Sequence, residues 1–412
     1  MIRITAFVFS PSLSSCRTFL LLGIFILLNL QMSASAVDLS LEEIYSTLGV
    51  EPNDAASKKL QQIYKKYSKV KRHKALALAM SQNNVSIGYS YKAQSELAAS
   101  QTAIAQCEKW RTDNNFGGHC EILLLGEQLV LPGRVLRQKV RPESPAMAWR
   151  LKGPNGLLYL IGTVHALKPS LLPMPAVFDH IFSEADNVAF EINPILMSDP
   201  ARANELQALM QVDPKEQKKL YDKSTKRALK KYAKYNGISA SAAYTLPIVI
   251  NALQVPQLKM AALGYAFNTG VEMHYAREAS KLGKAIIELE KPSTVIAMLL
   301  ALPIKTQLLM LRESILHLDA TPSSLDTLIT SWLTGDADMI YTETFLSITS
   351  NAQFEFLAVQ MLDDRNQLWM DKIDALIASP KTSVIMVGSA HFGGRKGLLA
   401  LLKQRGYEPV QL

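Results

Sequence analysis

The chain has 412 residues, of which 48% are apolar and 19% charged. This length exceeds one ordinary hydrophobic core, and the apolar content suffices for two or three domains, so a single small module and a wholly disordered chain are excluded. The formal net charge is +8, from 44 Lys and Arg against 36 Asp and Glu. Arg3 and Arg17 lie in a leader that we expect to be removed, which leaves 42 minus 36, or +6.

The first 36 residues have the pattern of a bacterial secretory signal. Arg17 leads into the apolar run 19–30, which is shorter than the roughly 20 residues that span a bilayer as a helix. Small residues before Val37 fit a peptidase cut at that point. We therefore expect residues 1–36 to be a signal peptide of a periplasmic or secreted protein that has no stable membrane insertion after cleavage. The alternative is an uncleaved anchor.

Removal of the leader leaves two cysteines, Cys107 and Cys120. Because exported proteins mature in an oxidising compartment, we expect these two residues to form a disulfide; the alternative is a pair of free thiols. A bond that closes so short a loop stabilises a small module by about 2–3 kcal/mol and has no chemical role.

The residues that precede the main domain divide into three segments. Apolar residues recur at helical spacing in 37–72, which predicts a helical segment. Residues 73–131 predict a small α+β module with the Cys107–Cys120 disulfide, and this segment resembles a short module of exported bacterial proteins. A basic stretch bounded by prolines, 132–145, is predicted to be a linker.

Two runs of basic residues raise the question of an anionic partner. Eight basic residues fall between Lys58 and Lys74, and nine fall between Lys215 and Lys234 on a stretch predicted to be one helix. We interpret both runs as solvated helix faces, because export places nucleic acid out of reach. No nucleic-acid partner is predicted.

Residues 146–412 alternate apolar strands with helices, which predicts a layered α/β domain. Two of the strands run directly into a Gly-x-x-His sequence, Gly162–His165 and Gly388–His391. With 20 Gly and 7 His in 412 residues, such a match arises by chance in about one chain in three, so the motif alone is weak. Its position is informative, because α/β sheets bind ligands beyond the carboxyl ends of their strands.

These motifs place His165 and His391 where they could bind one metal ion together. Glu191 follows a third apolar strand and would lie at the same edge. Imidazole and carboxylate are common metal ligands, and a carboxylate could also activate a metal-bound water. We therefore predict a divalent metal site formed by His165, His391 and Glu191, with Zn, Mn or Co as candidates. The alternative is that all three are strand-end side chains bonded to backbone.

At these residues the chain resembles the TraB/GumN family, whose eukaryotic relatives include the Tiki proteases. The resemblance covers about residues 148–412 and rests on the order of several short sequences: Ile161–His165, Phe190–Glu191, Leu289–Glu290, Asp364–Asn366 and Val387–His391. It implies an α/β fold of two related halves and, from the Tiki relatives, metal-dependent proteolysis through the paired Gly-x-x-His motifs and a glutamate.

The same resemblance suggests roles for three further residues. Arg365 fits a family position from which it could stabilise an oxyanion as a catalytic residue beside Glu191. Glu272 stands where relatives often carry Asp, so the carboxylate is kept with a longer reach. His274 is an additional histidine that we interpret as a surface residue of a helix.

Taken together, these features predict an exported metal-dependent hydrolase, a peptidase acting on a peptide or protein substrate. One alternative is a non-catalytic protein that binds or sequesters a peptide or glycan, and another is an accessory factor in envelope or exopolysaccharide assembly. The sequence contains no Walker loop, dinucleotide-binding glycine pattern or His-Glu-x-x-His helix, which disfavours nucleotide enzymes and zincin proteases.

Overall fold

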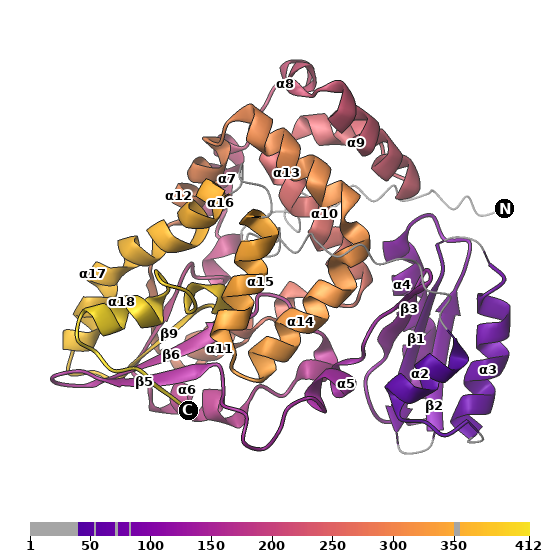
Figure 1. The fold of residues 1–412 in the computed structure, drawn as a ribbon, viewed down its shortest axis with the longest axis horizontal. Helices are drawn as coiled ribbons and strands as arrows, with labels where there is room; N and C mark the ends of the chain where they lie inside the picture. The colour runs from indigo at the N-terminus through magenta and orange to yellow at the C-terminus, as the bar shows by residue number, and fades with distance from the viewer. Residues whose placement is uncertain (1–39, 53–54, 71–72, 82–83, 350–354) are drawn as a thin grey trace.

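The computed structural model describes residues 40–52, 55–70, 73–81, 84–349 and 355–412. The predicted signal peptide lies outside these residues. A small module with a four-stranded sheet packs beside a larger part that contains a six-stranded sheet and most of the helices (Figure 1). The α/β class predicted from the sequence is confirmed.

The small module is an antiparallel sheet between two layers of helix. Its strands follow the order β2-β1-β3-β4, with β1 Ala75–Ser81, β2 Asn84–Ser90, β3 Glu121–Leu125 and β4 Gln128–Leu129. The alternate residues Ala75, Ala77 and Ala79 of β1 pack toward α4 (Glu96–Asp113). Leu76 and Leu78 pack on the opposite face, against α2 (Leu41–Leu48) and α3 (Ala55–Tyr67). Because both faces are covered, the strand is apolar throughout rather than alternating.

Capping residues define the ends of the first helix of this module, and a disulfide joins its α4 to the segment before β3. Ser40 and Glu43 form a capping box at the start of α2, and Gly49 ends the helix in the left-handed conformation. Cys107 near the end of α4 forms a disulfide with Cys120, with Cα atoms 5.9 Å apart. The predicted pairing of these cysteines is confirmed.

The larger part is built on a mixed sheet with the strand order β10-β5-β6-β9-β7-β8. The strands are β5 Ala148–Lys152, β6 Leu157–Thr163, β7 Asn187–Phe190, β8 Ala285–Glu288, β9 Ser383–Gly388 and β10 Val410–Gln411. The four strands β6, β9, β7 and β8 are parallel. At one edge β5 pairs antiparallel with β6, and β10 pairs antiparallel with β5. Every residue of β9 is buried, so both faces of the sheet are covered by other elements.

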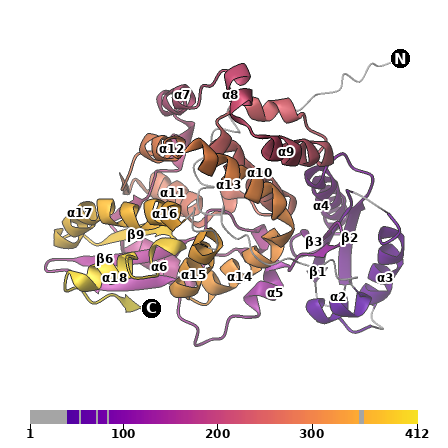
Figure 2. The ribbon, with the colours of Figure 1, turned by 45° about the horizontal axis from the view of Figure 1, so that its top comes forward.

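Helices surround this sheet and extend beyond it toward the small module (Figure 2). They are α6 Ala176–Glu184, α7 Pro200–Leu209, α8 Pro214–Leu220, α9 Lys223–Tyr235, α10 Ile248–Ala262, α11 Val271–Leu282, α12 Pro292–Leu300, α13 Ile304–Leu316, α14 Thr321–Leu333, α15 Ala337–Thr349, α16 Glu355–Ala358, α17 Asp364–Ala378 and α18 Leu398–Gln404. Much of α10 and α13 packs into a second apolar core away from the sheet.

The basic stretch that the sequence predicted as one helix is two helices. Leu220 ends α8, and Asp222 then caps α9 by accepting a hydrogen bond of 2.7 Å from the backbone N–H of Thr225. An Asp at this position satisfies the unpaired amides of a helix start, which favours a new helix over a continuous one. The lysines of both helices lie mainly on exposed faces.

Residues 132–145 connect the two parts through buried contacts. They contain the short helix α5 (Gly133–Arg137), and Leu136 is fully buried. The Glu121 carboxylate of the small module accepts hydrogen bonds from the Gly133 backbone and from Ser170. The buried Lys168 ammonium donates 2.6 Å to the carbonyl of Leu131. The junction therefore fixes the module against the larger part.

Within the described residues, no single helix is long and apolar enough to cross a membrane. The pair α12 and α13 passes a test of length and composition when taken together, but the two helices are bent by 101°.

Candidate functional site

The paired motifs lie at the carboxyl ends of neighbouring parallel strands. Thr163 at the end of β6 pairs with Gly388 at the end of β9, and Phe190 of β7 pairs with Met386 on the other side of β9. His165, Glu191 and His391 follow these strand ends directly, and all three are buried. The sheet thus places three titratable side chains at one edge, where α/β proteins bind ligands.

Close packing explains the first glycine of the motif. A Cβ atom at Gly162 would overlap the side chain of Met147 and would lie 3.0 Å from Oγ of Ser389. The same hydroxyl donates a hydrogen bond of 2.9 Å to the carbonyl of Thr163. The two Gly-x-x-His turns are therefore in contact with each other.

His391 is held as a neutral imidazole. The amide nitrogen of Asn366 donates to the carbonyls of His391 and Lys396, so its Oδ1 must be the atom that accepts a hydrogen bond of 2.6 Å from Nδ1 of His391. Burial, the nearby Arg365 and the nearby His165 lower the pKa of His391 well below its ordinary value. Nε2 of His391 therefore carries a lone pair.

His165 is held by a carboxylate. Its Nδ1 lies 2.7 Å from Oε1 of Glu272, which also accepts a hydrogen bond from the Thr163 hydroxyl. Burial lowers the pKa of His165, but Glu272 and Glu191 outweigh burial and raise it overall. Burial likewise acts to raise the pKa of Glu272, and the contacts with His165 and Thr163 reverse this effect and lower it.

The start of α11 brings Glu272 to the first motif. A Cβ atom at Gly270 would overlap the carbonyl oxygen of His165. Only glycine therefore allows the helix to begin so close to the His165 turn, and Glu272 in its first turn reaches the imidazole.

A buried arginine links the carboxylates of the site. Arg365 donates 2.7 Å to Oε2 of Glu191 and also pairs with Glu290, and its Nη1 lies 3.3 Å from Nε2 of His391. Burial opposes its charge, yet Glu290 and Glu191 raise the pKa of Arg365. Burial also raises the pKa of Glu290. Arg365 follows a π-helical turn, Val359–Asp363, a feature often found at functional sites.

Glu191 is fixed through both of its oxygens. Oε1 accepts a hydrogen bond of 2.6 Å from the backbone N–H of Gly388, while Oε2 accepts from Arg365. Oε1 lies 3.7 Å from Nε2 of His391. This separation is too long for a hydrogen bond, but two metal–ligand bonds of about 2 Å each could span it.

The two histidines fit a role as metal ligands. Metal-binding histidines usually donate their second ring N–H to an oxygen atom, and here Glu272 and Asn366 engage Nδ1 of the two rings. Within the described ranges, no three His, Cys, Asp or Glu side chains already form a metal-binding group. Glu191 is the carboxylate beside Nε2 of His391, at 3.7 Å, and Arg365 bonds its other oxygen.

The sequence analysis singled out Glu272 but did not predict its contact with His165. It included Glu290 and Asn366 in family-like motifs without assigning their roles, which depend on contacts with Arg365 and His391. His274 is half-buried on α11, with its ring against Tyr275. His180 and His317 pair with Glu184 and Glu313 on their own helices.

A layered α/β domain with Gly-x-x-His turns on adjacent parallel strands defines the class of protein. The chain belongs to the TraB/PrgY/gumN family, whose model matches residues 147–411. It is similar to the uncharacterized protein YbaP of Escherichia coli (strain K12) and of Shigella flexneri. Each is 28% identical over 264 residues, which cover 63% of this chain and 92% of the relative. No solved structure matches the chain significantly.

Proposed function

We propose that this protein is a metal-dependent hydrolase that cuts peptide bonds, with His165 and His391 as metal ligands. The observation that carries the proposal is the anchoring of both imidazoles through Nδ1, by Glu272 at 2.7 Å and by Asn366 at 2.6 Å. Nε2 of each ring would then be the coordinating atom, and in His391 the ion would replace the contact of Nε2 with Nη1 of Arg365. The resemblance to the Tiki proteases supports the same assignment.

Glu191 is assigned either as the third ligand or as the general base. Its position 3.7 Å from Nε2 of His391 suits a donor to the same ion. As a base it would accept a proton from the attacking water, with Arg365 and Gly388 keeping its carboxylate in place. A bound divalent ion such as Zn²⁺, Mn²⁺ or Co²⁺ supplies a lowered water pKa and polarises the peptide carbonyl.

Arg365 acts in this proposal chiefly through Glu191. Its guanidinium bonds two carboxylates, Glu191 and Glu290, in a buried position. To stabilise an oxyanion, the guanidinium would have to donate a hydrogen bond to it in addition to those it donates to the two carboxylates. That catalytic role stays a prediction, tested by whether Arg365→Lys lowers kcat without changing metal affinity.

Metal content and peptide cleavage together test the hydrolase proposal. Protein covering residues 37–412 would be stripped with a chelator, reloaded separately with Zn²⁺, Mn²⁺ or Co²⁺, and incubated with a mixed peptide library analysed by mass spectrometry. We expect about one ion per chain and metal-dependent cleavage. His165→Ala and His391→Ala should lose both properties, whereas the exposed His180→Ala should keep both.

Glu191→Gln separates the two roles of the carboxylate. Retained metal with lost cleavage would identify a base, and lost metal would identify a ligand. A wild-type protein that binds none of these ions, or histidine variants that still cleave the same peptides, would refute the metal mechanism. Peptide binding without cleavage would then favour the sequestration function.

We also propose that the protein is exported. The Cys107–Cys120 disulfide supports an oxidising compartment, as does the similarity of residues 73–131 to a module of exported proteins. Cell fractionation and N-terminal sequencing should find the mature chain in the periplasm or medium, beginning at Val37. A chain that starts at Met1 in the cytoplasm would contradict export.

A further inference from the structure

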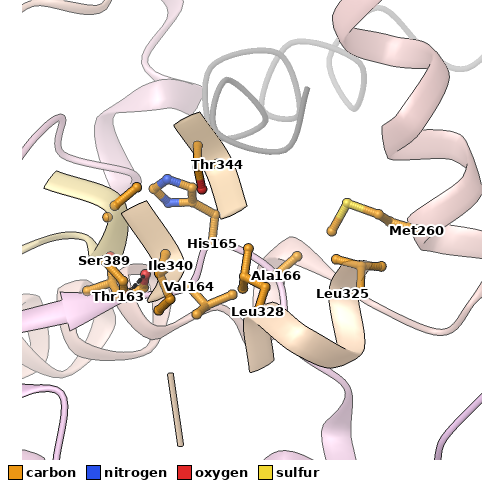
Figure 3. Close-up of a pocket in the computed structure, with 12 residues that line it drawn as sticks. Thr163, Val164, His165, Ala166, Met260, Leu325, Leu328, Ile340, Thr344 and Ser389 are labelled. Carbon is orange, nitrogen blue, oxygen red and sulfur yellow. Dashed lines mark hydrogen bonds between the residues drawn. The ribbon is translucent and has the colours of Figure 1, made fainter. Parts of the chain in front are cut away.

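An apolar pocket adjoins the first histidine motif. It is partly open to solvent. The two Gly-x-x-His turns form one wall, and α10, α14 and α15 form the others (Figure 3). The lining residues outside the turns are Ala166, Met260, Leu325, Leu328, Ile340 and Thr344.

The side chains that line the pocket favour an apolar occupant. Met260, Leu325 and Ile340 are at most 3% exposed, and all three contribute apolar side chains to the lining. The hydroxyls of Thr163 and Ser389 donate to Glu272 and to the carbonyl of Thr163. His165 is the one ionisable residue among those that line the pocket in the described part of the chain.

We propose that this pocket binds an aliphatic side chain of the peptide substrate, of the size of leucine or methionine, beside the bond that is cut. The inference rests on the proposed function, because His165 belongs both to the pocket and to the proposed metal site. A buried aliphatic side chain contributes about 1.5–3 kcal/mol of binding free energy, whereas a charged side chain would lose its hydration without a partner.

Binding can be measured without any turnover. Protein labelled with [ε-¹³C]methionine would be titrated in the absence of metal with N-acetyl-leucinamide, and separately with N-acetyl-serinamide and N-acetyl-lysinamide. The Met260 methyl resonance, assigned from Met260→Leu, should shift with the leucine compound and not with the other two. No shift, or equal shifts with all three compounds, would overturn the proposal.

Substitutions at the half-buried Leu328 test specificity. Leu328→Trp should fill the pocket and lower kcat/KM for cleavage beside leucine by about 10-fold to 100-fold, with metal content unchanged. Leu328→Ala should enlarge the pocket and shift the preference toward phenylalanine. The control is Leu282→Trp, because Leu282 is 64% exposed on α11. This variant should cleave beside the same side chains as the wild type.

The two readouts separate failure of the pocket from failure of the hydrolase. Cleavage without any preference for aliphatic residues, together with a silent Met260 resonance, would refute the pocket and leave the hydrolase intact. A Met260 shift in a protein that cleaves nothing would support the pocket while refuting the hydrolase. If Leu328→Trp does not fold, Leu328→Ala and the Met260 titration still decide the question.

Discussion

Oδ1 of Asn366 lies 2.6 Å from Nδ1 of His391, and the amide nitrogen of the same Asn366 is committed to two backbone carbonyls. This fixes which nitrogen of His391 carries the proton. Asn366→Ala removes the acceptor, so we expect metal affinity to fall by about 10-fold to 100-fold. Titration calorimetry of the stripped protein measures the change. The exposed Asn268→Ala is the control, and an unchanged affinity in Asn366→Ala would contradict this role.

Arg365 neutralises charge in the core of the site. Arg365→Ala would leave Glu191 and Glu290 buried without their cation, which costs about 3–5 kcal/mol for a broken buried ion pair. Urea unfolding should show this loss in the free energy of unfolding. Arg150→Ala, at an exposed position of β5, should unfold like the wild type. Equal stability of the two variants would show that Arg365 is not required to hold these carboxylates.

Asp326 should make stability depend on pH. Burial raises its pKa to about 6, against the attraction of Lys168. The folded protein thus holds this proton more tightly than the unfolded chain, so Asp326 costs stability as pH rises from about 4 through about 6. A shift of about two pKa units corresponds to about 3 kcal/mol at most.

The variant Asp326→Asn isolates this effect. Its free energy of unfolding, measured in urea relative to the wild type, should increase by up to about 3 kcal/mol between pH 4 and pH 7. For the control Asp371→Asn, at an exposed position, the difference in free energy of unfolding from the wild type should be equal at pH 4 and pH 7. A constant difference for Asp326→Asn as well would refute the assignment.

The disulfide should stabilise the small module without affecting the site. Cys107 and Cys120 are 13 residues apart in sequence, and closing a loop of this length contributes about 3 kcal/mol. The double variant Cys107→Ser with Cys120→Ser should lose this amount in urea unfolding, and a reductant should lower the wild type to the same stability. Metal content should not change. Two free thiols in non-reduced protein recovered from the periplasm would contradict the bond in the cell.

The central strands were predictable because parallel strands buried on both faces read as apolar runs. The runs that end at Thr163 and Gly388 therefore identified both the sheet and the edge where the histidines lie. The walls of the pocket were not predictable in the same way. Leu325 and Ile340 belong to helices whose apolar residues could face either core, and only packing decides which one.

The partners of the site residues also depend on the three-dimensional structure. Glu272 is 107 residues beyond His165 in the chain, and it reaches the imidazole because α11 starts beside the His165 turn. The contacts of the predicted linker, 132–145, also depend on packing. Arg134 and Arg137 turn their guanidinium groups toward the carbonyls of Leu48 and Leu171, whereas Lys139 and Arg141 are exposed.

The buried Lys168 contacts residues that lie outside the segment shared with the relatives. Burial lowers the pKa of its ammonium, and Glu121, a residue of β3, is the first of the charges that oppose this effect. Its hydrogen-bond acceptor is the carbonyl of Leu131. Both partners precede residue 147, where the family match begins. A chain cut at that boundary would retain Lys168, three residues from His165, without its hydrogen-bond acceptor and without Glu121, and with Asp326 as a remaining countercharge. We therefore expect the segment shared with relatives to be less stable alone than in the full chain.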